Sequence, residues 1–375
     1  MKIIFSSNIS WSIYNFRKGL LTSLKNEGHK IFTVGLQDDY SKKLQELGFE
    51  HTNILINNNS KNPIKDLNLI YQYYKIYKKL DPDVICHNAI KPNIYGTIAA
   101  GILNIPVVNN ISGLGTLFIK KSLSTRIAKF LYWISQKWTS RVFFQNKDDL
   151  DLFLKSKLVT KDKCLLIAGS GVNTNLFIRD EVENKKNANF VFLFIGRLIY
   201  DKGIREFIEA AEIVKNTVSN VEFNILGPIY KSNETAIKKI ELENWIRKGY
   251  INYIGESDFV KEEMAKANCI VLPSYREGLS KVLIEASSMS LPIITTNVPG
   301  CRDVVIDKQT GFLCEVRNSK DLADKMIKML NLPLVEIITM GINGRKRAVE
   351  FFDEQIIINH YKNVIYSIHD ETNNK

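Results

Sequence analysis

Cysteine and histidine are scarce in this 375-residue sequence, and neither follows a metal-binding spacing. The cysteines are odd in number, scattered and mostly flanked by apolar residues. This pattern excludes a disulfide framework and indicates buried thiols in a reducing compartment. The five histidines also lack the paired spacing of a zinc site, so we expect none. The cysteines are Cys86, Cys164, Cys269, Cys301 and Cys314.

Long uninterrupted apolar runs are also missing. The opening MKIIFSSNIS reads as a strand, and its apolar run is too short for a signal peptide. Residues 93–118 carry no charge, but asparagine, proline and glycine interrupt them. We therefore expect a buried helix and a strand there, not a transmembrane segment. With 45% hydrophobic and 24% charged residues, the composition is that of a soluble protein with room for two domains.

Acidic residues are absent between Asp83 and Asp148, a stretch of 64 residues that holds eight cations. Within it, residues 122–140 (SLSTRIAKFLYWISQKWTS) mix cations with aromatic side chains. A basic, aromatic helix fits an anionic membrane surface or a lipid diphosphate. A core helix with a basic outer face is one alternative; a nucleic-acid site is another, but no nucleic-acid-binding motif supports it. The residues predicted to meet the membrane or lipid diphosphate are Lys120, Lys121, Arg126, Lys129 and Trp133.

Glycine is missing from the loop that follows the first predicted strand, residues 7–17. Dinucleotide-binding folds place G-x-G-x-x-G there, so its absence argues against a nicotinamide-dependent dehydrogenase. P-loop and serine-hydrolase motifs are absent too. The loop instead offers groups suited to sugar hydroxyls or a diphosphate, although capping the next helix explains them equally well. The candidate ligand-binding residues are Ser10, Ser12, Asn15 and Arg17, with His87, which ends a later strand, and Lys91.

Short apolar runs typical of strands alternate with helical patterns along the chain. One series lies between residues 2 and 168, and a second begins at residue 190, after the polar stretch ENKKNAN. This alternation predicts the α/β class, with a doubly wound parallel sheet in each half. Ligands bind such sheets at the carboxyl ends of the strands.

Residues 271–285, VLPSYREGLSKVLIE, carry the most informative pattern. The apolar run 269–272 predicts a buried strand, and a helix is expected to begin near Gly278. A helix start leaves backbone N–H groups unpaired, which suits an anion. The amides in question belong to Gly278, Leu279 and Ser280.

Two glutamates flank this expected anion site. Glu277 would repel a bare phosphate, so it fits a ligand that also presents a sugar hydroxyl. Glu285 lies about two turns along the helix, where it could meet a ribose hydroxyl. An ordinary strand-helix unit with two surface glutamates is the alternative interpretation.

A second strand-to-helix loop, GRLIYDKG at 196–203, follows the apolar run 190–195. It presents Arg197 and Lys202 at the carboxyl end of a predicted strand. A guanidinium can bind a diphosphate through two parallel hydrogen bonds, and a nearby ammonium adds charge. The alternative is two solvated surface cations.

Together these segments resemble the family 4 glycosyltransferases of the GT-B fold. The resemblance rests on Glu277 to Glu285 as the E-x7-E element and on the loop 196–203, and it spans about residues 1–352. It is strongest for a bacterial branch acting in lipid-linked oligosaccharide, O-antigen or capsule assembly. Asn173 departs from the family, which often has Asp there. The further matching segments are GSGVNTNLF (169–177), WSIYNFR (11–17), KPNIYG (91–96), SGLGTLF (112–118) and FFQNKDDL (143–150).

The resemblance implies two Rossmann-like domains with parallel sheets facing across a cleft. Residues 1–170 would bind the acceptor, residues 171–350 the nucleotide sugar, and residues 351–375 would form a helix returning to the first domain. It implies a retaining, metal-independent transfer, without cofactor, from a UDP-linked hexose or N-acetylhexosamine to a polyprenyl-diphosphate saccharide. The enzyme would be cytoplasmic, bound peripherally to the cytoplasmic face of the inner membrane. A non-catalytic nucleotide-sugar or saccharide binding protein of the same fold is the alternative.

The resemblance also assigns roles to the candidate residues. Arg197 and Lys202 would neutralise the leaving diphosphate, and Glu277 would orient the donor sugar. Glu285 and the three amides at 278–280 would hold the rest of the donor. The acceptor would meet the polar residues of the amino-terminal half.

Overall fold

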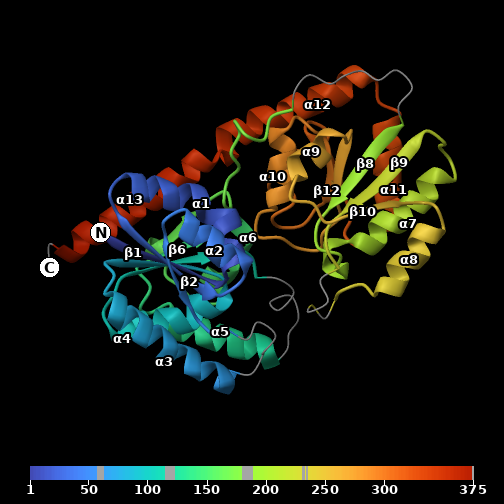
Figure 1. The fold of residues 1–375 in the computed structure, drawn as a ribbon. Coiled ribbons are helices and arrows are strands. Elements are labelled where there is room, and N and C mark those ends of the chain that lie inside the picture. The colour runs from blue at the N-terminus through green and yellow to red at the C-terminus, as the bar shows by residue number, and fades with distance from the viewer. Residues whose placement is uncertain (57–62, 115–122, 180–188, 230–232, 234, 374–375) are drawn as a thin grey trace. The chain divides into compact units, whose positions relative to one another are not determined.

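The computed structural model describes residues 1–56, 63–114, 123–179, 189–229, 233 and 235–373. They form two compact units (Figure 1). Unit 1 comprises Met1–Ser170 and Glu354–Lys375, and unit 2 comprises Gly171–Asp353. Each unit is built on a parallel sheet with helices between its strands, which confirms the predicted fold class.

Unit 1 contains, within the described residues, a seven-stranded sheet in the order β3-β2-β1-β4-β5-β6-β7. Its neighbouring strands all pair in parallel. The strands are β1 (Lys2–Ile9), β2 (Lys30–Leu36), β3 (Glu50–Asn53), β4 (Val84–Asn88), β5 (Val107–Ile111), β6 (Arg141–Phe144) and β7 (Cys164–Leu166). The helices are α1 (Ser10–Asn26), α2 (Asp39–Glu46), α3 (Pro63–Leu80), η1 (Pro92–Gly96), α4 (Thr97–Ile102), α5 (Leu123–Ser135), α6 (Lys147–Lys155), η3 (Lys161–Lys163) and α13 (Glu354–Asn373).

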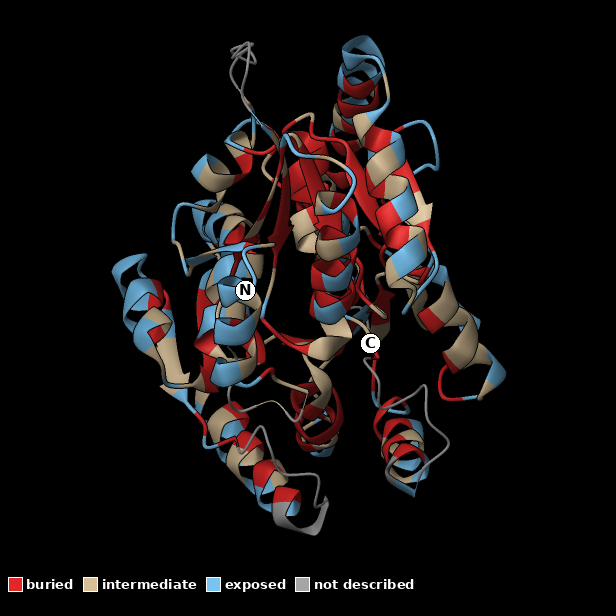
Figure 2. Ribbon diagram, turned by 90° about the vertical axis from the view of Figure 1, so that its right-hand side faces the viewer, coloured by how far each residue is buried: buried red, intermediate tan, exposed pale blue. Residues whose placement is uncertain are grey.

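The core of unit 1 lies on both faces of this sheet, because successive strand residues point to opposite sides. Ile4 of β1 belongs to the cluster that includes Tyr73 of α3 and Tyr132 of α5. Its neighbour Phe5 belongs to the other cluster, with Leu21 of α1 and Tyr361 of α13. Figure 2 colours buried residues red and exposed residues pale blue, and the strands that are visible in it, mainly those of unit 2, are red between helices with pale blue outer faces. The last helix, α13, is therefore part of the unit 1 core.

Unit 2 contains, over its described ranges, a six-stranded sheet in the order β10-β9-β8-β11-β12-β13. These neighbours are also parallel. The strands are β8 (Phe190–Ile195), β9 (Val221–Leu226), β10 (Asn252–Gly255), β11 (Cys269–Leu272), β12 (Ile293–Thr296) and β13 (Gly311–Cys314). The helices are η4 (Tyr200–Lys202), α7 (Ile204–Lys215), α8 (Lys239–Arg247), α9 (Val260–Ala265), α10 (Lys281–Ser288), α11 (Ser319–Leu330), α12 (Leu334–Arg347) and η5 (Ala348–Phe352).

Both sheets reverse their winding direction beside their first strand. In unit 1 the reversal lies between β1 and β4, and in unit 2 it lies between β8 and β11. At such a switch point the loops after the two strands leave in opposite directions and open a crevice for ligands. The topology therefore points to the loops after β1 and β4, and after β8 and β11.

Candidate active site

The switch point of unit 2 brings Lys202 and Glu277 into direct contact. Lys202 ends η4 in the loop after β8, and Glu277 lies in the loop after β11. The Lys202 ammonium donates to Glu277 Oε1 and forms an ion pair with it. Their side chains are 19% and 14% exposed, so water screens this pair less than a surface pair. The structure thus joins two of the predicted catalytic residues, which lie 75 positions apart.

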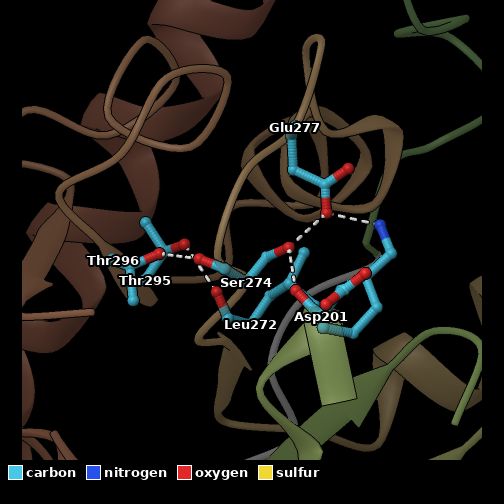
Figure 3. A network of polar contacts seen from close by, with 7 residues as sticks. Asp201, Leu272, Ser274, Glu277, Thr295 and Thr296 are labelled. Carbon is cyan, nitrogen blue, oxygen red and sulfur yellow. Dashed lines mark hydrogen bonds and ion pairs between the residues drawn. The ribbon is translucent and has the colours of Figure 1, made fainter. Parts of the chain in front are cut away.

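Further hydrogen bonds hold the Glu277 carboxylate (Figure 3). Ser274 Oγ donates to Glu277 Oε1 at 2.7 Å and lies 3.1 Å from the Asp201 carbonyl oxygen. The Thr296 hydroxyl donates in turn to the Ser274 carbonyl. These contacts hold the Glu277 side chain in place. Ser274 and Thr296 were not among the predicted site residues; Ser274 stands inside the motif, whereas Thr296 is twenty-two positions away and carried no sequence signal.

Glycines allow the loops of this site to approach one another. Gly203 has φ +74°, and a Cβ there would meet the Pro273 carbonyl oxygen at 2.0 Å. Gly300 has φ +77°, and a Cβ there would meet the Glu277 carbonyl oxygen at 2.5 Å. Any other residue would be strained at both positions and would push the backbone of the neighbouring loop away. The contact between Lys202 and Glu277 depends on this close packing.

The expected anion site at residues 278–280 differs from the prediction. Helix α10 begins at Lys281, with Ser280 as its N-cap, and not near Gly278. The Ser280 amide donates to the Gly300 carbonyl oxygen at 3.0 Å, so it is not available to a ligand. Gly278 is buried and Leu279 is partly buried. The sequence misplaced the helix start because this pairing involves Gly300, which is distant along the chain.

Glu285 lies one turn into α10 and is buried. Burial raises the pKa of its carboxyl group to about 7, and the nearby Lys281 ammonium opposes this shift. The ammonium lies 3.8 Å from Glu285 Oε1 and also donates to the Gly171 carbonyl oxygen at 2.6 Å. Arg197, the remaining predicted donor residue, is exposed in the turn after β8.

A second polar cluster adjoins this site, and it was not predicted. Tyr275 donates its hydroxyl hydrogen to Glu206 Oε1 of α7 at 2.7 Å. The other oxygen of Glu206, Oε2, is buried and has no hydrogen-bond partner among the described residues. The Arg317 guanidinium lies 4.5 Å from the centre of the Tyr275 ring. Burial, more than the adjacent Glu206 carboxylate, raises the pKa of Tyr275.

The switch point of unit 1 carries hydroxyl and amide groups. Helix α1 begins at Ser10, so the residues expected in a loop lie on its first turns. Ser12 is partly buried and donates to the Ile9 carbonyl oxygen at 3.0 Å. Asn15 is exposed and donates to the Trp11 carbonyl oxygen at 2.9 Å. Ser10 is fully buried and donates to the Leu36 carbonyl oxygen, which withdraws it from any surface.

Arg17 anchors a row of side-chain amides at this edge of the sheet. It is buried, and its Nε donates to Asn88 Oδ1 at 3.0 Å. Asn110 Nδ2 donates to the same oxygen at 3.1 Å, and Gln145 Nε2 lies 3.4 Å from Asn110 Oδ1. The row thus follows the carboxyl ends of β4, β5 and β6. Its three amides were missed because they are isolated in the sequence, although each one ends or follows an apolar strand run.

His87 and Lys91 lie inside unit 1 and are not placed to contact a ligand at its surface. His87 is fully buried, with Nε2 2.8 Å from the Tyr77 hydroxyl and Nδ1 3.0 Å from Asn109 Oδ1. Burial lowers the pKa of His87 to about 3, so the ring is neutral. Lys91 is buried in an ion pair with Asp66, whose carboxylate lies 2.8 Å away. The prediction assumed that a residue at a strand end is accessible, but these side chains point into the core.

Three of the five predicted membrane residues belong to α5. Arg126 and Trp133 are exposed, and Lys129 is partly buried, donating to Ser156 Oγ at 3.2 Å. Lys120 and Lys121 lie outside the described residues.

In the described part of the chain, no three histidine, cysteine, aspartate or glutamate residues gather as potential metal ligands. No single helix there has the length and apolar character to span a membrane; one bent pair, residues 319–330 with 334–352 at 112°, meets those criteria together.

The chain contains two parallel α/β units, and one of them has a charged pair at its switch point. This is the arrangement of a GT-B glycosyltransferase. The family model described as "Glycosyl transferases group 1" matches residues 177–347, within unit 2. The model described as "Glycosyl transferase 4-like" matches residues 2–146, within unit 1. Two glycosyltransferase models thus match most of the chain between them, which confirms the predicted resemblance to GT-B glycosyltransferases.

Relatives and solved structures agree with this assignment. The chain is 27% identical over 376 residues to the Campylobacter jejuni N,N'-diacetylbacillosaminyl-diphospho-undecaprenol alpha-1,3-N-acetylgalactosaminyltransferase, covering 96% of this chain and 97% of that one. It is 26% identical to an Escherichia coli UDP-Gal:alpha-D-GlcNAc-diphosphoundecaprenol alpha-1,3-galactosyltransferase, covering 77% and 76%. Its fold matches Anabaena Alr3699/HepE in complex with UDP, with a TM-score of 0.80 at 18% identity, covering 98% and 100%.

Proposed function

We propose that this protein is a retaining, metal-independent glycosyltransferase that moves a sugar from a UDP-sugar to a polyprenyl-diphosphate-linked saccharide. The observation that carries the proposal is the contact between Lys202 and Glu277 at the switch point of unit 2. An ammonium there suits a diphosphate, and a carboxylate beside it suits a sugar hydroxyl. A nucleotide-sugar donor presents both groups together.

The residues of unit 2 would act mainly through electrostatics. A bound diphosphate would compete with Glu277 for the Lys202 ammonium, and Glu277 would then accept a hydrogen bond from the donor sugar. As the bond to the sugar breaks, negative charge builds on the diphosphate, and Lys202 and Arg197 stabilise it. Interactions that strengthen in the transition state in this way raise the rate of the chemical step. Glu285 would hold the nucleotide from α10.

The relatives support the choice of donor and acceptor classes. Both named enzymes act, by their names, on saccharides linked to a diphosphate of undecaprenol, and one uses a UDP-sugar. The fold neighbour binds UDP. We therefore propose a hexose or N-acetylhexosamine on UDP as donor, and surface polysaccharide or glycan assembly as the process.

Unit 1 would receive the acceptor, with its amide row at residues 88, 110 and 145. Amides can both donate to and accept from hydroxyl groups, which suits a neutral saccharide. Ser12 and Asn15 on the first turns of α1 add groups at the same edge of the sheet. Because a polyprenyl chain anchors such an acceptor in a bilayer, the proposal includes peripheral association with the cytoplasmic face of the inner membrane.

Turnover by purified protein tests this proposal. The protein, in EDTA, is incubated with a panel of UDP-sugars and a synthetic short-chain prenyl-diphospho-N-acetylhexosamine, and product is identified by mass spectrometry. Product whose new linkage keeps the donor's anomeric configuration is expected. If UDP-sugars bind but no donor is turned over under any condition, the alternative of a non-catalytic binding protein is favoured.

A further inference from the structure

Helix α5 exposes large apolar side chains. Leu123, Phe130 and Trp133 are 72%, 57% and 44% exposed. The helix buries Thr125, Ala128, Tyr132 and Ser135, of which Ala128 and Tyr132 belong to the hydrophobic core. A surface helix of a water-soluble protein normally presents polar residues on its outer face.

The inner side of α5 is mixed: Ala128 and Tyr132 join the hydrophobic core, whereas the end of the helix meets polar groups. Ser135 donates to the Tyr132 carbonyl oxygen, and the next residue, Gln136, accepts from Asn109 Nδ2 at 3.2 Å. Phe130 and Trp133 stack on each other at 6.1 Å, forming one apolar surface. Trp138, just beyond the helix, is also 44% exposed.

A pocket of about 430 Å³ opens beside this surface, within the size range of ligand sites. Its apolar side is made by Trp133 together with residues of α6 and the following loop. Its polar side carries three ammonium groups and no carboxylate. The lining residues are Trp133, Gln136, Lys137, Leu154, Lys157, Leu158, Val159, Thr160 and Lys163.

The lysines of this pocket have distinct environments. Lys137 Nζ lies 3.6 Å from the centre of the Trp133 ring. Lys163 lies near the Gln136 and Lys137 carbonyl oxygens, and burial lowers its pKa. The charged neighbours that act on Lys163 are Asp162, which raises its pKa, and Arg141, which lowers it. Lys157 is exposed, as Lys137 is, so its ammonium is accessible to a ligand at the pocket.

The position of the pocket separates it from the candidate active site. Its residues end α5 and α6, just before β6 and β7 begin, so it lies at the amino-terminal edge of the unit 1 sheet. The amide row lies at the opposite, carboxyl-terminal edge. A molecule held in the pocket would therefore not present its sugar to that row, which argues against the acceptor as its ligand.

We propose that this pocket binds the phosphate headgroup of an anionic phospholipid while the apolar surface of α5 enters the bilayer interface. Cations attract anionic lipid, and Trp and Phe are suited to the interface beside the headgroups. The absence of acidic residues from 84 to 147 removes charges that would repel such a surface. The inference rests on the proposed function only in that a lipid-anchored acceptor calls for a membrane-bound enzyme.

Sedimentation with liposomes tests the pocket without requiring turnover, so failure of the transferase reaction would not affect the result. The full chain is mixed with phosphatidylcholine vesicles containing 0 or about 30 mol% phosphatidylglycerol. We expect binding only with phosphatidylglycerol, and K157Q should weaken it about fivefold, as expected for one cation near an anionic surface. The matched control is K161Q, an exposed lysine close by that does not line the pocket.

The result for the control decides between a pocket and a diffuse charge effect. If K161Q weakens binding as much as K157Q, or if pure phosphatidylcholine binds equally well, the pocket proposal is wrong. Inorganic phosphate should compete with the headgroup and displace more protein than chloride does at equal ionic strength. Binding of phosphate to the free protein without any binding to phosphatidylglycerol vesicles would assign the pocket to free phosphate and overturn the lipid.

Insertion of α5 has a separate measurement. Brominated acyl chains should quench tryptophan fluorescence of the bound protein, and W133F should lose most of that quenching while still sedimenting. F130S, which changes the apolar surface outside the pocket, should weaken binding although all lysines remain. Unchanged quenching in W133F would show that α5 does not enter the interface.

Discussion

The two units share one topology but differ in the chemistry at their switch points. In unit 2 the crevice between β8 and β11 contains opposite charges, Lys202 and Glu277, in direct contact. In unit 1 the crevice between β1 and β4 contains Arg17 and side-chain amides. Among the described residues, the partners of Arg17 are Asn88, the Phe16 carbonyl and the Tyr361 ring, none of them a carboxylate. The same backbone arrangement therefore supports two kinds of recognition.

Charged and neutral side chains suit different parts of the proposed reaction. A leaving diphosphate gains negative charge as the reaction proceeds, so a cation held nearby contributes most in the transition state. Saccharide hydroxyls stay neutral, so amides can bind them without the cost of desolvating a charge. We infer that rate depends mainly on unit 2 and acceptor affinity mainly on unit 1.

The largest expected effect comes from Lys202→Ala. Losing the ammonium should cost about 3 kcal/mol of transition-state stabilisation, or roughly a hundredfold in kcat. Initial rates at saturating donor and acceptor measure it. The matched control is Lys239→Ala, an exposed lysine on α8 of the same unit, which should keep its rate. A near-normal kcat in Lys202→Ala would contradict the inferred difference between the units, because unit 2 would then not act through this charge.

The pH dependence of stability tests unit 2 separately, because its residue Glu285 has a carboxyl pKa that is raised to about 7. Burial favours its protonated form, so its contribution to stability is complete below the ordinary pKa of 4.5 and is lost as pH rises through about 7. Relative to Glu285→Gln, the wild type should lose up to about 3 kcal/mol across that window. Thermal melts of both proteins from pH 4.5 to 8 measure the difference. His87, whose pKa is lowered to about 3, changes stability below its ordinary pKa of 6.5, but it is present in both proteins and cancels in the difference. Parallel curves would contradict the assignment to Glu285.

Glu277→Gln keeps the shape of the side chain and removes its charge. Losing hydrogen bonds to a charged acceptor costs about 1.5–3 kcal/mol each. We expect kcat to fall at least tenfold while the melting temperature changes little, because the neighbours of Glu277 can still pair with the amide. Ser274→Ala, which removes one donor to the same carboxylate, should have a smaller effect. A lower melting temperature with unchanged kcat would make Glu277 a structural residue.

The smallest effect is expected in unit 1. Asn88→Ala should raise the KM for the acceptor about fivefold, as loss of one neutral hydrogen bond of about 1 kcal/mol predicts. Its kcat and the KM for the donor should stay close to wild type. Asn359→Ala, an exposed change on α13 of the same unit, serves as the control. An equal rise in both KM values would show that the two units do not divide recognition in this way.

The sequence predicted the fold class and the charged part of the site more fully than the rest. Buried strand runs followed by helical spacing indicate parallel sheets, and motif order pointed to Lys202 and Glu277. The helix start was misplaced by three residues, because the hydrogen bond that fixes it reaches Gly300, outside the motif. His87 shows the limit in unit 1, where a polar strand end gave no sign of which way it points.

By itself, the sequence determined the order of strands and helices and the family of this protein, because apolar spacing and local motifs are encoded in neighbouring residues. Only the tertiary structure decided which side chains meet. The amide row joins Asn88 to Asn110 across 22 positions. The exposed side of α5 is set by which of its residues pack against the rest of unit 1. Such contacts depend on strand order and helix rotation, which a one-dimensional pattern does not specify.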